Sequence, residues 1–378
     1  MPAGEPPFRA DHVGSLIRPP HLIEARRQRE AGAIDAAALC AVEDECIRAA
    51  VALQEGAGLN AITDGEFRRR VWYADFLTGF DNVKEAPGLL EVRTANPDGS
   101  VAASRLNGML LTGKLGRRCG IQTDSFDFLR SVSSRTAKVC IPSPSMMHFR
   151  GGRGAIDRDA YPDMAQFWDD LVRVYCEEIL DLVARGMTYL QLDDTNLAYL
   201  CDENFRAAVR AIGEDADTLP QTYCDVINSI IRALPDHVIV TIHLCRGNAR
   251  ASGVAAAGLA RGGYEAVGEV LFGSLDVDGY FLEYDDERSG GFAPLRLVPP
   301  GKKVVLGLIT TKRRELEPKD ALKRRIDEAA RFLPLDQLCL SPQCGFSSGV
   351  GARALTIDDE KAKLALVVET ADDVWGGA

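Results

Sequence analysis

Short apolar runs of strand length alternate with amphipathic runs of helix length along almost the whole chain of 378 residues. The strand-like runs are rich in Val, Ile and Leu, which is typical of strands buried on both faces. They are Arg9–Leu16, Asn60–Glu66, Ala137–Pro144, Tyr189–Thr195, Val238–Cys245, Gly279–Tyr284, Lys303–Ile309 and Leu338–Cys344. The clearest helix-like runs are Ile34–Gln54, Ala165–Ala184, Ala256–Leu271, Pro318–Phe332 and Asp358–Thr370.

Eight strands alternating with helices indicate an α/β protein and favour a (β/α)8 TIM barrel. Periodicity alone also allows an open doubly wound sheet, but the strand count and the chain length favour the barrel. No segment reads as a linker, so we expect one catalytic domain over residues 1–378. Residues 81–136 separate the second and third strands by more than a helix and a loop, and NPDGS at 96–100 is typical of a turn. We therefore expect an inserted hairpin there, and a long loop over the barrel mouth at residues 285–301.

Charge and cysteine usage exclude several classes of protein. The formal net charge is −11, which argues against a nucleic-acid-binding scaffold. No apolar run is long enough to span a membrane, and no apolar segment typical of a secretory signal stands near the N-terminus, so we expect a cytoplasmic protein. The ten cysteines are scattered and form no CxxC pair. Most should therefore be free thiols buried as small hydrophobes in a reducing compartment.

Polar residues collect where the predicted strands end. Catalytic groups of a TIM barrel lie at the carboxyl ends of its strands. Seven of the eight runs finish in residues that can titrate, form hydrogen bonds or bind a metal. These ends are HVGS (12–15), ITDGE (62–66), IPSPS (141–145), QLDDTN (191–196), IHLC (242–245), FLEYDD (281–286) and SPQCG (341–345).

Four of these strand-end residues predict a metal site. His243 and Cys245 are two residues apart on one strand, so their side chains project to the same side. Glu283 ends the next strand and Cys344 ends the last. One imidazole, two thiolates and a carboxylate suit Zn²⁺. A strand-end cysteine taken alone is more often a buried hydrophobe, and we expect Cys339 and Cys201 to be of that kind.

Several motifs in the same order resemble the cobalamin-independent methionine synthase family. The signature is HxC, then Glu, then PxCG, preceded by HVGS, DGE and QLDD, and the resemblance to the family's C-terminal catalytic barrel covers nearly the whole chain. It implies that His243, Cys245, Glu283 and Cys344 are zinc ligands. It also implies that Gly14, Ser15, Glu66 and Asp193 hold the amino-acid end of homocysteine.

The implied activity is zinc-dependent methyl or alkyl transfer to a small thiol, most simply homocysteine to methionine with a methyl-folate such as 5-methyltetrahydropteroyltriglutamate as donor. A metal-bound thiol is deprotonated at neutral pH and can attack an alkyl carbon. Glu66 and Asp193 can pair with an ammonium group, and the backbone N–H of Ser15 can bind a carboxylate. Of the two neighbouring aspartates, we expect Asp193 to face the site and Asp194 to support it or to cap a helix. The simplest alternative for Glu66 is a helix-start carboxylate beside Arg68–Arg70.

The chain departs from the family pattern on the donor side. Because the resemblance to the catalytic barrel takes up nearly all of the 378 residues, we expect no counterpart of the family's additional N-terminal barrel among them. The stretch after the third strand reads SPSMMHF where the family has an aromatic residue, and the seventh strand runs into LITTKRRELE without the family's His. Lys312 is a candidate replacement for that His.

Three other functions stay open. An epoxide–coenzyme M thiol alkyltransferase would use Arg68, Arg69, Arg70 or Arg246 to bind a sulfonate, unless these form an exposed basic cluster. Trp72, Tyr73 and Phe76 would line a pocket or belong to the core.

A zinc hydrolase is disfavoured because two thiolate ligands make Zn²⁺ a weaker Lewis acid. A zinc-binding protein without turnover would need neither Glu66 nor Asp193. Assembly into a homo-oligomer is also open.

Overall fold

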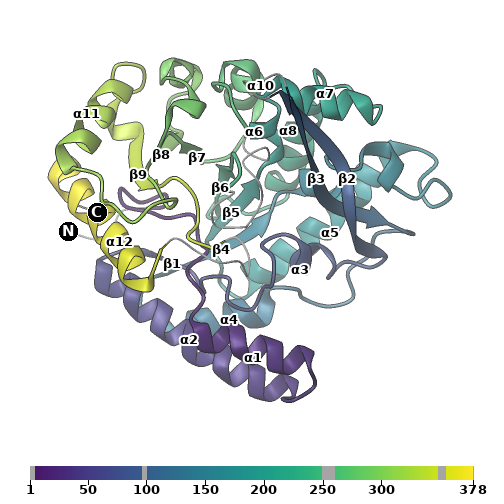
Figure 1. Ribbon diagram of the computed structural model, residues 1–378, viewed down its shortest axis with the longest axis horizontal. Helices are drawn as coiled ribbons and strands as arrows, with labels where there is room; N and C mark the ends of the chain where they lie inside the picture. The colour runs from purple at the N-terminus through teal and green to yellow at the C-terminus, as the bar shows by residue number, and fades with distance from the viewer. Residues whose placement is uncertain (1–4, 96–99, 249–259, 348–354, 378) are drawn as a thin grey trace.

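The computed structural model describes residues 5–95, 100–248, 260–347 and 355–377. Its centre is a curved sheet of seven strands, all paired in parallel and ordered as they occur in the sequence, with helices packed around it (Figure 1). The strands are β1 (Ala61–Ile62), β4 (Thr136–Pro142), β5 (Tyr189–Asp194), β6 (Ile239–Leu244), β7 (Gly279–Glu283), β8 (Lys303–Ile309) and β9 (Leu338–Pro342). The expected α/β class is confirmed, and each strand lies within or next to one of the last seven strand-like runs.

The first strand-like run, Arg9–Leu16, differs from the expectation. It forms one isolated parallel bridge, between Ala10 and Leu340 of β9, in place of a ladder. On its other side, His12 Nε2 lies 3.1 Å from the carbonyl oxygen of Ala61, and the Thr63 hydroxyl donates to the carbonyl of Gly14 at 2.6 Å. Gly14 has a φ of +129°, which is outside the extended region and ends the strand-like backbone. The run therefore lies between β9 and β1 without a continuous ladder to either.

The helices follow the amphipathic runs of the sequence. α2 begins where Asp35 accepts a hydrogen bond from the Ala38 N–H at 2.8 Å, and it ends at Gly58, whose φ is +96°. Four of the five expected helices are confirmed as α2, α5, α11 and α12. The fifth was expected over residues 256–271, of which 256–259 lie outside the described residues; α10 begins at Glu265. None of the described helices is long and apolar enough to cross a bilayer.

The helix bounds are α1 (Pro20–Glu30), α2 (Ala36–Ala57), α3 (Ala74–Leu77), α4 (Thr123–Val132), α5 (Met164–Ala184), α6 (Asn196–Tyr199), α7 (Glu203–Ala211), α8 (Leu219–Ile231), α10 (Glu265–Ser274), α11 (Lys319–Ala329) and α12 (Ile357–Trp375). Short 3₁₀ turns are η1 (Pro144–Met147), η2 (Gly152–Ala155), η4 (Glu287–Ser289), η5 (Ala293–Leu297) and η6 (Leu335–Gln337).

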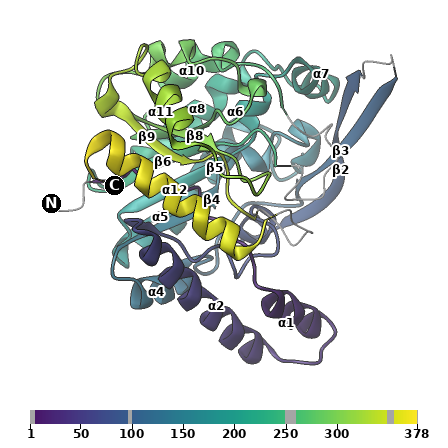
Figure 2. The ribbon, with the colours of Figure 1, turned by 60° about the vertical axis from the view of Figure 1, so that its left-hand side comes forward.

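A second sheet stands apart from the main one. β2 (Val83–Ala95) and β3 (Val101–Leu111) pair antiparallel, from Val83 opposite Leu111 to Ala95 opposite Val101. Figure 2 shows this two-stranded ribbon projecting from the rest of the molecule. The two strands lie between β1 and β4 in the sequence, and their connection at 96–99 is outside the described residues.

The interior of the main sheet contains a buried ion pair. Lys138 Nζ of β4 lies 3.0 Å from Asp11 Oδ1, and both side chains are fully buried. The Tyr189 hydroxyl donates to the other oxygen of Asp11 at 2.8 Å. Because a buried charge is costly unless it is paired, these contacts tie the first segment of the chain to β4 and β5.

Candidate metal centre

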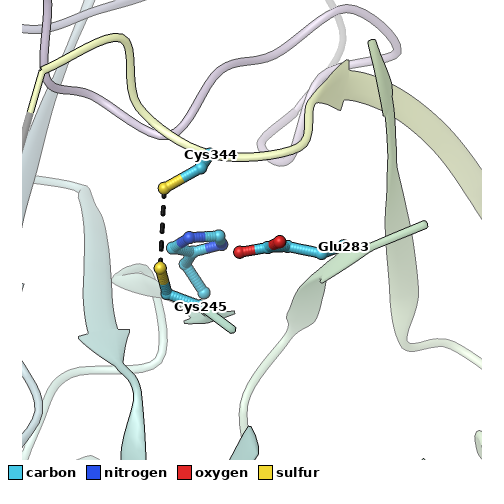
Figure 3. A group of neighbouring side chains, drawn as sticks. Cys245, Glu283 and Cys344 are labelled. Carbon is cyan, nitrogen blue, oxygen red and sulfur yellow. Dashed lines mark hydrogen bonds between the residues drawn. The ribbon is translucent and has the colours of Figure 1, made fainter. Parts of the chain in front are cut away.

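Four side chains of types that can bind a metal meet at the carboxyl edge of the main sheet. His243 lies in β6 and Cys245 follows that strand; Glu283 is the last residue of β7, and Cys344 lies just after β9. One donor atom from each residue can be chosen so that all four lie within 4.8 Å of one another. Figure 3 shows the side chains of Cys245, Glu283 and Cys344 pointing toward one another. The group can therefore hold a metal ion.

The His243 imidazole has the properties of a ligand. Its side chain is buried, and neither ring nitrogen has a hydrogen-bond partner among the described residues. Burial lowers the pKa of His243 to about 3, so the ring is neutral near pH 7. A buried polar atom without a partner is costly, and a metal ion would satisfy one of these nitrogens.

Only one of the two carboxyl oxygens of Glu283 accepts a hydrogen bond from the described residues. Its Oε1 accepts a hydrogen bond from the backbone N–H of Arg246 at 2.8 Å. Its Oε2 is buried and has no hydrogen-bond partner within the described part of the chain. Burial raises the pKa of Glu283 to about 7. A nearby cation would favour the charged carboxylate.

The two thiols complete the donor set. Cys245 Sγ lies 3.5 Å from Cys344 Sγ, well beyond the length of about 2.05 Å of a disulfide bond. The backbone N–H of Cys245 donates to the carbonyl of Asp194 at 2.7 Å, which fixes the start of this loop. The hydrogen bond with Cys344, together with burial, raises the pKa of Cys245 well above its usual value. Two thiols, one imidazole and one carboxylate match the ligand types of protein zinc sites.

Two other cysteines serve as internal comparisons. Cys339 of β9 is fully buried in a cluster with Val13, Phe281 and Val305. Cys201 belongs to the main hydrophobic core. Both are structural, as the sequence predicted.

Gly14 and Ser15 lie beside the Cys344 loop. A Cβ on Gly14 would lie 2.6 Å from Cys140 Sγ, so a larger residue does not fit there. The Ser15 carbonyl accepts a hydrogen bond from the Phe346 N–H at 2.8 Å. A Cβ on Gly345 would lie 2.0 Å from Ser15 Oγ. The two chain segments are thus in direct contact next to Cys344.

Glu66 and Asp193 are buried carboxyls at the same edge of the sheet. Arg69 Nη1 lies 3.8 Å from Glu66 Oε2, which makes no hydrogen bond within the described residues. Gln191 Nε2 donates to Asp193 Oδ1 at 2.6 Å. Burial raises the pKa of both carboxyls, and the charge of Glu66 raises that of Asp193 further. A cationic group placed beside them would favour their charged forms.

Asp194 has the supporting role predicted for it. Its Oδ1 accepts a hydrogen bond at 2.7 Å from the backbone N–H of Leu197, in the first turn of α6. Its other oxygen accepts from the Ser145 hydroxyl. Asp194 therefore joins the loops that follow β4 and β5.

The predicted group of arginines divides into buried and outer members. Arg68 pairs with Glu43 and Asp44, and the half-exposed Arg70 pairs with Glu85. Arg69 is buried against Glu66, and Arg246 is buried with its guanidinium carbon 4.2 Å from the centre of the Tyr264 ring. The four residues thus form neither one exposed cluster nor one anion site.

Other residues named from the sequence are placed as follows. Lys312 Nζ lies 2.9 Å from Asp285 and 3.3 Å from Asp286, close in sequence to Glu283. Tyr73 and Phe76 belong to the hydrophobic core, and Trp72 is only partly buried against it.

Sequence reasoning missed three residues at this edge: Arg18, Arg150 and Tyr199. Arg18 is buried and donates to the backbone carbonyls of Glu66 and Arg69 at 2.9 and 2.8 Å. It thereby holds the loop that carries Glu66. Its other guanidinium nitrogen donates to the carbonyl and the hydroxyl of Ser347. Nothing in its local sequence indicates this role, because these partners lie at least 48 positions away in the sequence.

No protein-family model matches the chain. Two curated relatives are the uncharacterized proteins YxjH and YxjG of Bacillus subtilis (strain 168). YxjH is 42% identical over 371 residues, covering 98% of this chain and 95% of YxjH. YxjG is 42% identical over 374 residues, covering 98% and 96%. The methionine synthase of Sulfolobus acidocaldarius is 22% identical over 338 residues, covering 88% and 84%.

Two solved structures resemble the chain over nearly its whole length. One, from Listeria monocytogenes, is provisionally described as a vitamin-B12 independent methionine synthase; it is 36% identical, covers 98% of both chains and has a TM-score of 0.77. The other is a B12-independent methionine synthase from Shewanella sp. W3-18-1 in complex with selenomethionine. It is 19% identical, covers 97% of both chains and has a TM-score of 0.71, so it supports the fold alone.

Proposed function

This chain belongs to the cobalamin-independent methionine synthase family, and from that premise we propose that it transfers a methyl or alkyl group to a small thiol. We propose further that this thiol is homocysteine. The observation that carries the proposal is the convergence of His243, Cys245, Glu283 and Cys344 within 4.8 Å. Unpaired polar atoms on His243 and Glu283 support it, because both are buried and a metal would satisfy them.

The ion proposed for this group is Zn²⁺. When bound, it would supply a lowered thiol pKa, so that a substrate thiol is a nucleophile at neutral pH. The chain contributes a neutral His243, two cysteines and a carboxylate that the Arg246 N–H orients.

Homocysteine is favoured as the thiol because of the acidic pair beside the metal group. Glu66 and Asp193 are proposed to hold its ammonium group, and the Gly14–Ser15 loop its carboxylate. Pairing with a cation would offset the cost of burying both carboxyls. Two carboxyls would repel the sulfonate of coenzyme M, and a metal store without turnover would need neither of them. A methyl-folate is the proposed donor, to be aligned with the thiol for in-line transfer.

The same family membership supports a finer description of the fold. We propose that the segment around Ala10 closes the sheet, between β9 and β1, into a (β/α)8 barrel. Residues 1–378 would then form one catalytic domain, with the excursion at 81–136 inserted between the second and third barrel strands.

Metal analysis combined with calorimetry tests the proposed function. Reduced protein should contain about one zinc per chain. Titration with homocysteine in buffers of different ionisation enthalpy should show proton release. Coenzyme M should bind more weakly than homocysteine. Absence of stoichiometric zinc would reject the zinc site. Tighter binding of coenzyme M than of homocysteine would reject homocysteine as the thiol.

A further inference from the structure

Arg150 is a buried cation without an ion pair. The residue lies between η1 and η2 in the sequence and is only 7% exposed. No carboxylate oxygen of the described residues lies within 4.0 Å of its guanidinium, and its Nε is buried without a hydrogen-bond partner there. Three other buried cations are ion-paired: Arg69 with Glu66, Lys138 with Asp11, and Lys363 with Glu317. The buried Arg246 also has no ion pair among the described residues, but its guanidinium lies over the Tyr264 ring and donates to the carbonyl of Gly262. Because an uncompensated buried charge is costly, Arg150 needs an explanation.

The surroundings of Arg150 hold the guanidinium in place without neutralising it. Nη1 donates to the backbone carbonyl of Asn107 in β3 at 2.7 Å. The guanidinium carbon lies 5.0 Å from the centre of the Tyr73 ring. A Cβ on Gly108 would lie 2.9 Å from the Cβ of Arg150, so this glycine lets β3 approach the arginine closely. These neutral contacts orient the side chain and leave its charge free to bind an anion.

Arg150 lies at the same edge of the sheet as the metal group. It is reached a few residues after the carboxyl end of β4, and Tyr73 is reached after that of β1. Tyr199, in α6 after β5, links the two regions. Burial raises the pKa of Tyr199, the charges of Cys245, Glu283 and Cys344 raise it further, and the charge of Arg150 opposes them. The Tyr199 hydroxyl thus lies within electrostatic range of both Arg150 and the metal ligands.

We propose that Arg150 binds an anionic group, a carboxylate, sulfonate or phosphate, on the second substrate, the alkyl donor. A guanidinium can bind any of these oxyanions through two parallel hydrogen bonds. The thiol is assigned elsewhere, because the proposed partners of its ammonium and carboxylate groups are Glu66, Asp193 and the Gly14–Ser15 loop. The identity of the ligand as the donor rests on the proposed function, whereas the anion site rests on Arg150 itself.

Calorimetric titration of the zinc-loaded full chain at low ionic strength tests this site with three probes: 5-methyltetrahydrofolate, inorganic phosphate and inorganic sulfate. Arg150→Gln should weaken the binding of the tightest probe at least about tenfold, since it removes the charge and the hydrogen bonds that the charge strengthens. Arg150→Lys should recover part of the binding, because it keeps the charge and loses the planar fork. The control is Arg93→Gln, which removes an equal charge from β2 at a side chain that is 74% exposed, and it should leave binding unchanged. The probe that binds best identifies the anion class.

The outcomes separate this site from the proposed function. If the wild-type chain binds none of the probes, or if Arg150→Gln binds them as tightly as the wild-type chain, the anion site is wrong. Zinc content and homocysteine binding are measured on the same samples and should not change in Arg150→Gln. If the wild-type chain fails those two measurements while probe binding still depends on Arg150, the methyl-transfer proposal falls and the anion site stands. Thermal unfolding of each variant shows whether it is folded. If Arg150→Gln has a folding defect, the probe affinity of Arg150→Lys decides whether the anion site exists.

Discussion

Cys245 Sγ and Cys344 Sγ lie 3.5 Å apart although 99 positions separate the two residues in the sequence. Their strands, β6 and β9, are not neighbours, because β7 and β8 lie between them in the sheet. Three steps across a flat sheet would span roughly 14 Å, at about 4.8 Å per step. The contact therefore depends on the curvature of the sheet, which brings the carboxyl ends of β6 and β9 together.

Cys245→Ser and Cys344→Ser should each lower zinc affinity by more than about 100-fold, because even residues that only support metal ligands contribute about 10- to 100-fold. Chelator competition followed by elemental analysis measures this loss. Cys339→Ser, in the same strand as the Cys344 segment but inside the core, is the matched control and should retain zinc. Equal zinc affinity in Cys344→Ser and Cys339→Ser would contradict the ligand assignment.

Glu66→Gln and Asp193→Asn should each weaken homocysteine binding roughly 10- to 100-fold, the range that corresponds to about 1.5–3 kcal/mol for a hydrogen bond to a charged group. Zinc content should stay at the wild-type level, because neither residue belongs to the four-residue metal group. Calorimetry on the zinc-loaded variants measures both quantities. Asp159→Asn, on an exposed loop, controls for the loss of one negative charge. Unchanged homocysteine affinity would remove these two residues from the substrate site.

Zinc affinity should rise as the pH increases through 7. In the metal-free chain the pKa of Glu283 is raised to about 7, so below that pH zinc must displace a proton from the carboxyl. His243, with its pKa lowered to about 3, is already neutral and adds no pH dependence in this range. Chelator competition at pH 6, 7 and 8 gives the slope.

The variant that isolates this effect is Glu283→Gln, which should bind zinc more weakly and with a shallower dependence on pH below 7. A slope equal to that of the wild-type chain would mean that the carboxyl exchanges no proton on metal binding.

Gly14→Ala should destabilise the chain by about 2–6 kcal/mol, the sum of backbone strain and steric overlap. The φ of +129° is unfavourable for alanine, and the new Cβ would meet Cys140 Sγ at 2.6 Å. Gly32→Ala separates the two causes, since Gly32 also has a positive φ of +72° but no atom within 4 Å of the added carbon. Denaturant unfolding compares the variants. Gly14→Ala combined with Cys140→Ala should recover only the steric part; full recovery, or none, would show that one cause had been misjudged.

The amino-acid sequence by itself indicated most of the elements and the four residues of the candidate metal group. Buried parallel strands need continuous apolar runs, so β4 to β9 are visible as such runs, and the polar residues that end them stand out. His243 and Cys245 are two residues apart where β6 ends, which places them together from local geometry alone. The run at Arg9–Leu16 was also predicted to be a strand, but the positive φ at Gly14 and the absence of a continuous ladder among the described residues became visible only in the fold.

Only the tertiary structure decided which charged residues are buried and with what they pair. Residues 68–70 are three consecutive arginines, which the sequence alone does not distinguish. Arg69 is buried against Glu66, whereas Arg68 pairs with a residue of α2 and Arg70 with a residue of β2. The fold likewise shows that Arg150 is buried and that no described residue forms an ion pair with it. Burial and pairing depend on atoms brought close by chain segments distant in the sequence, and a charge is stabilised or destabilised by those atoms rather than by its sequence neighbours.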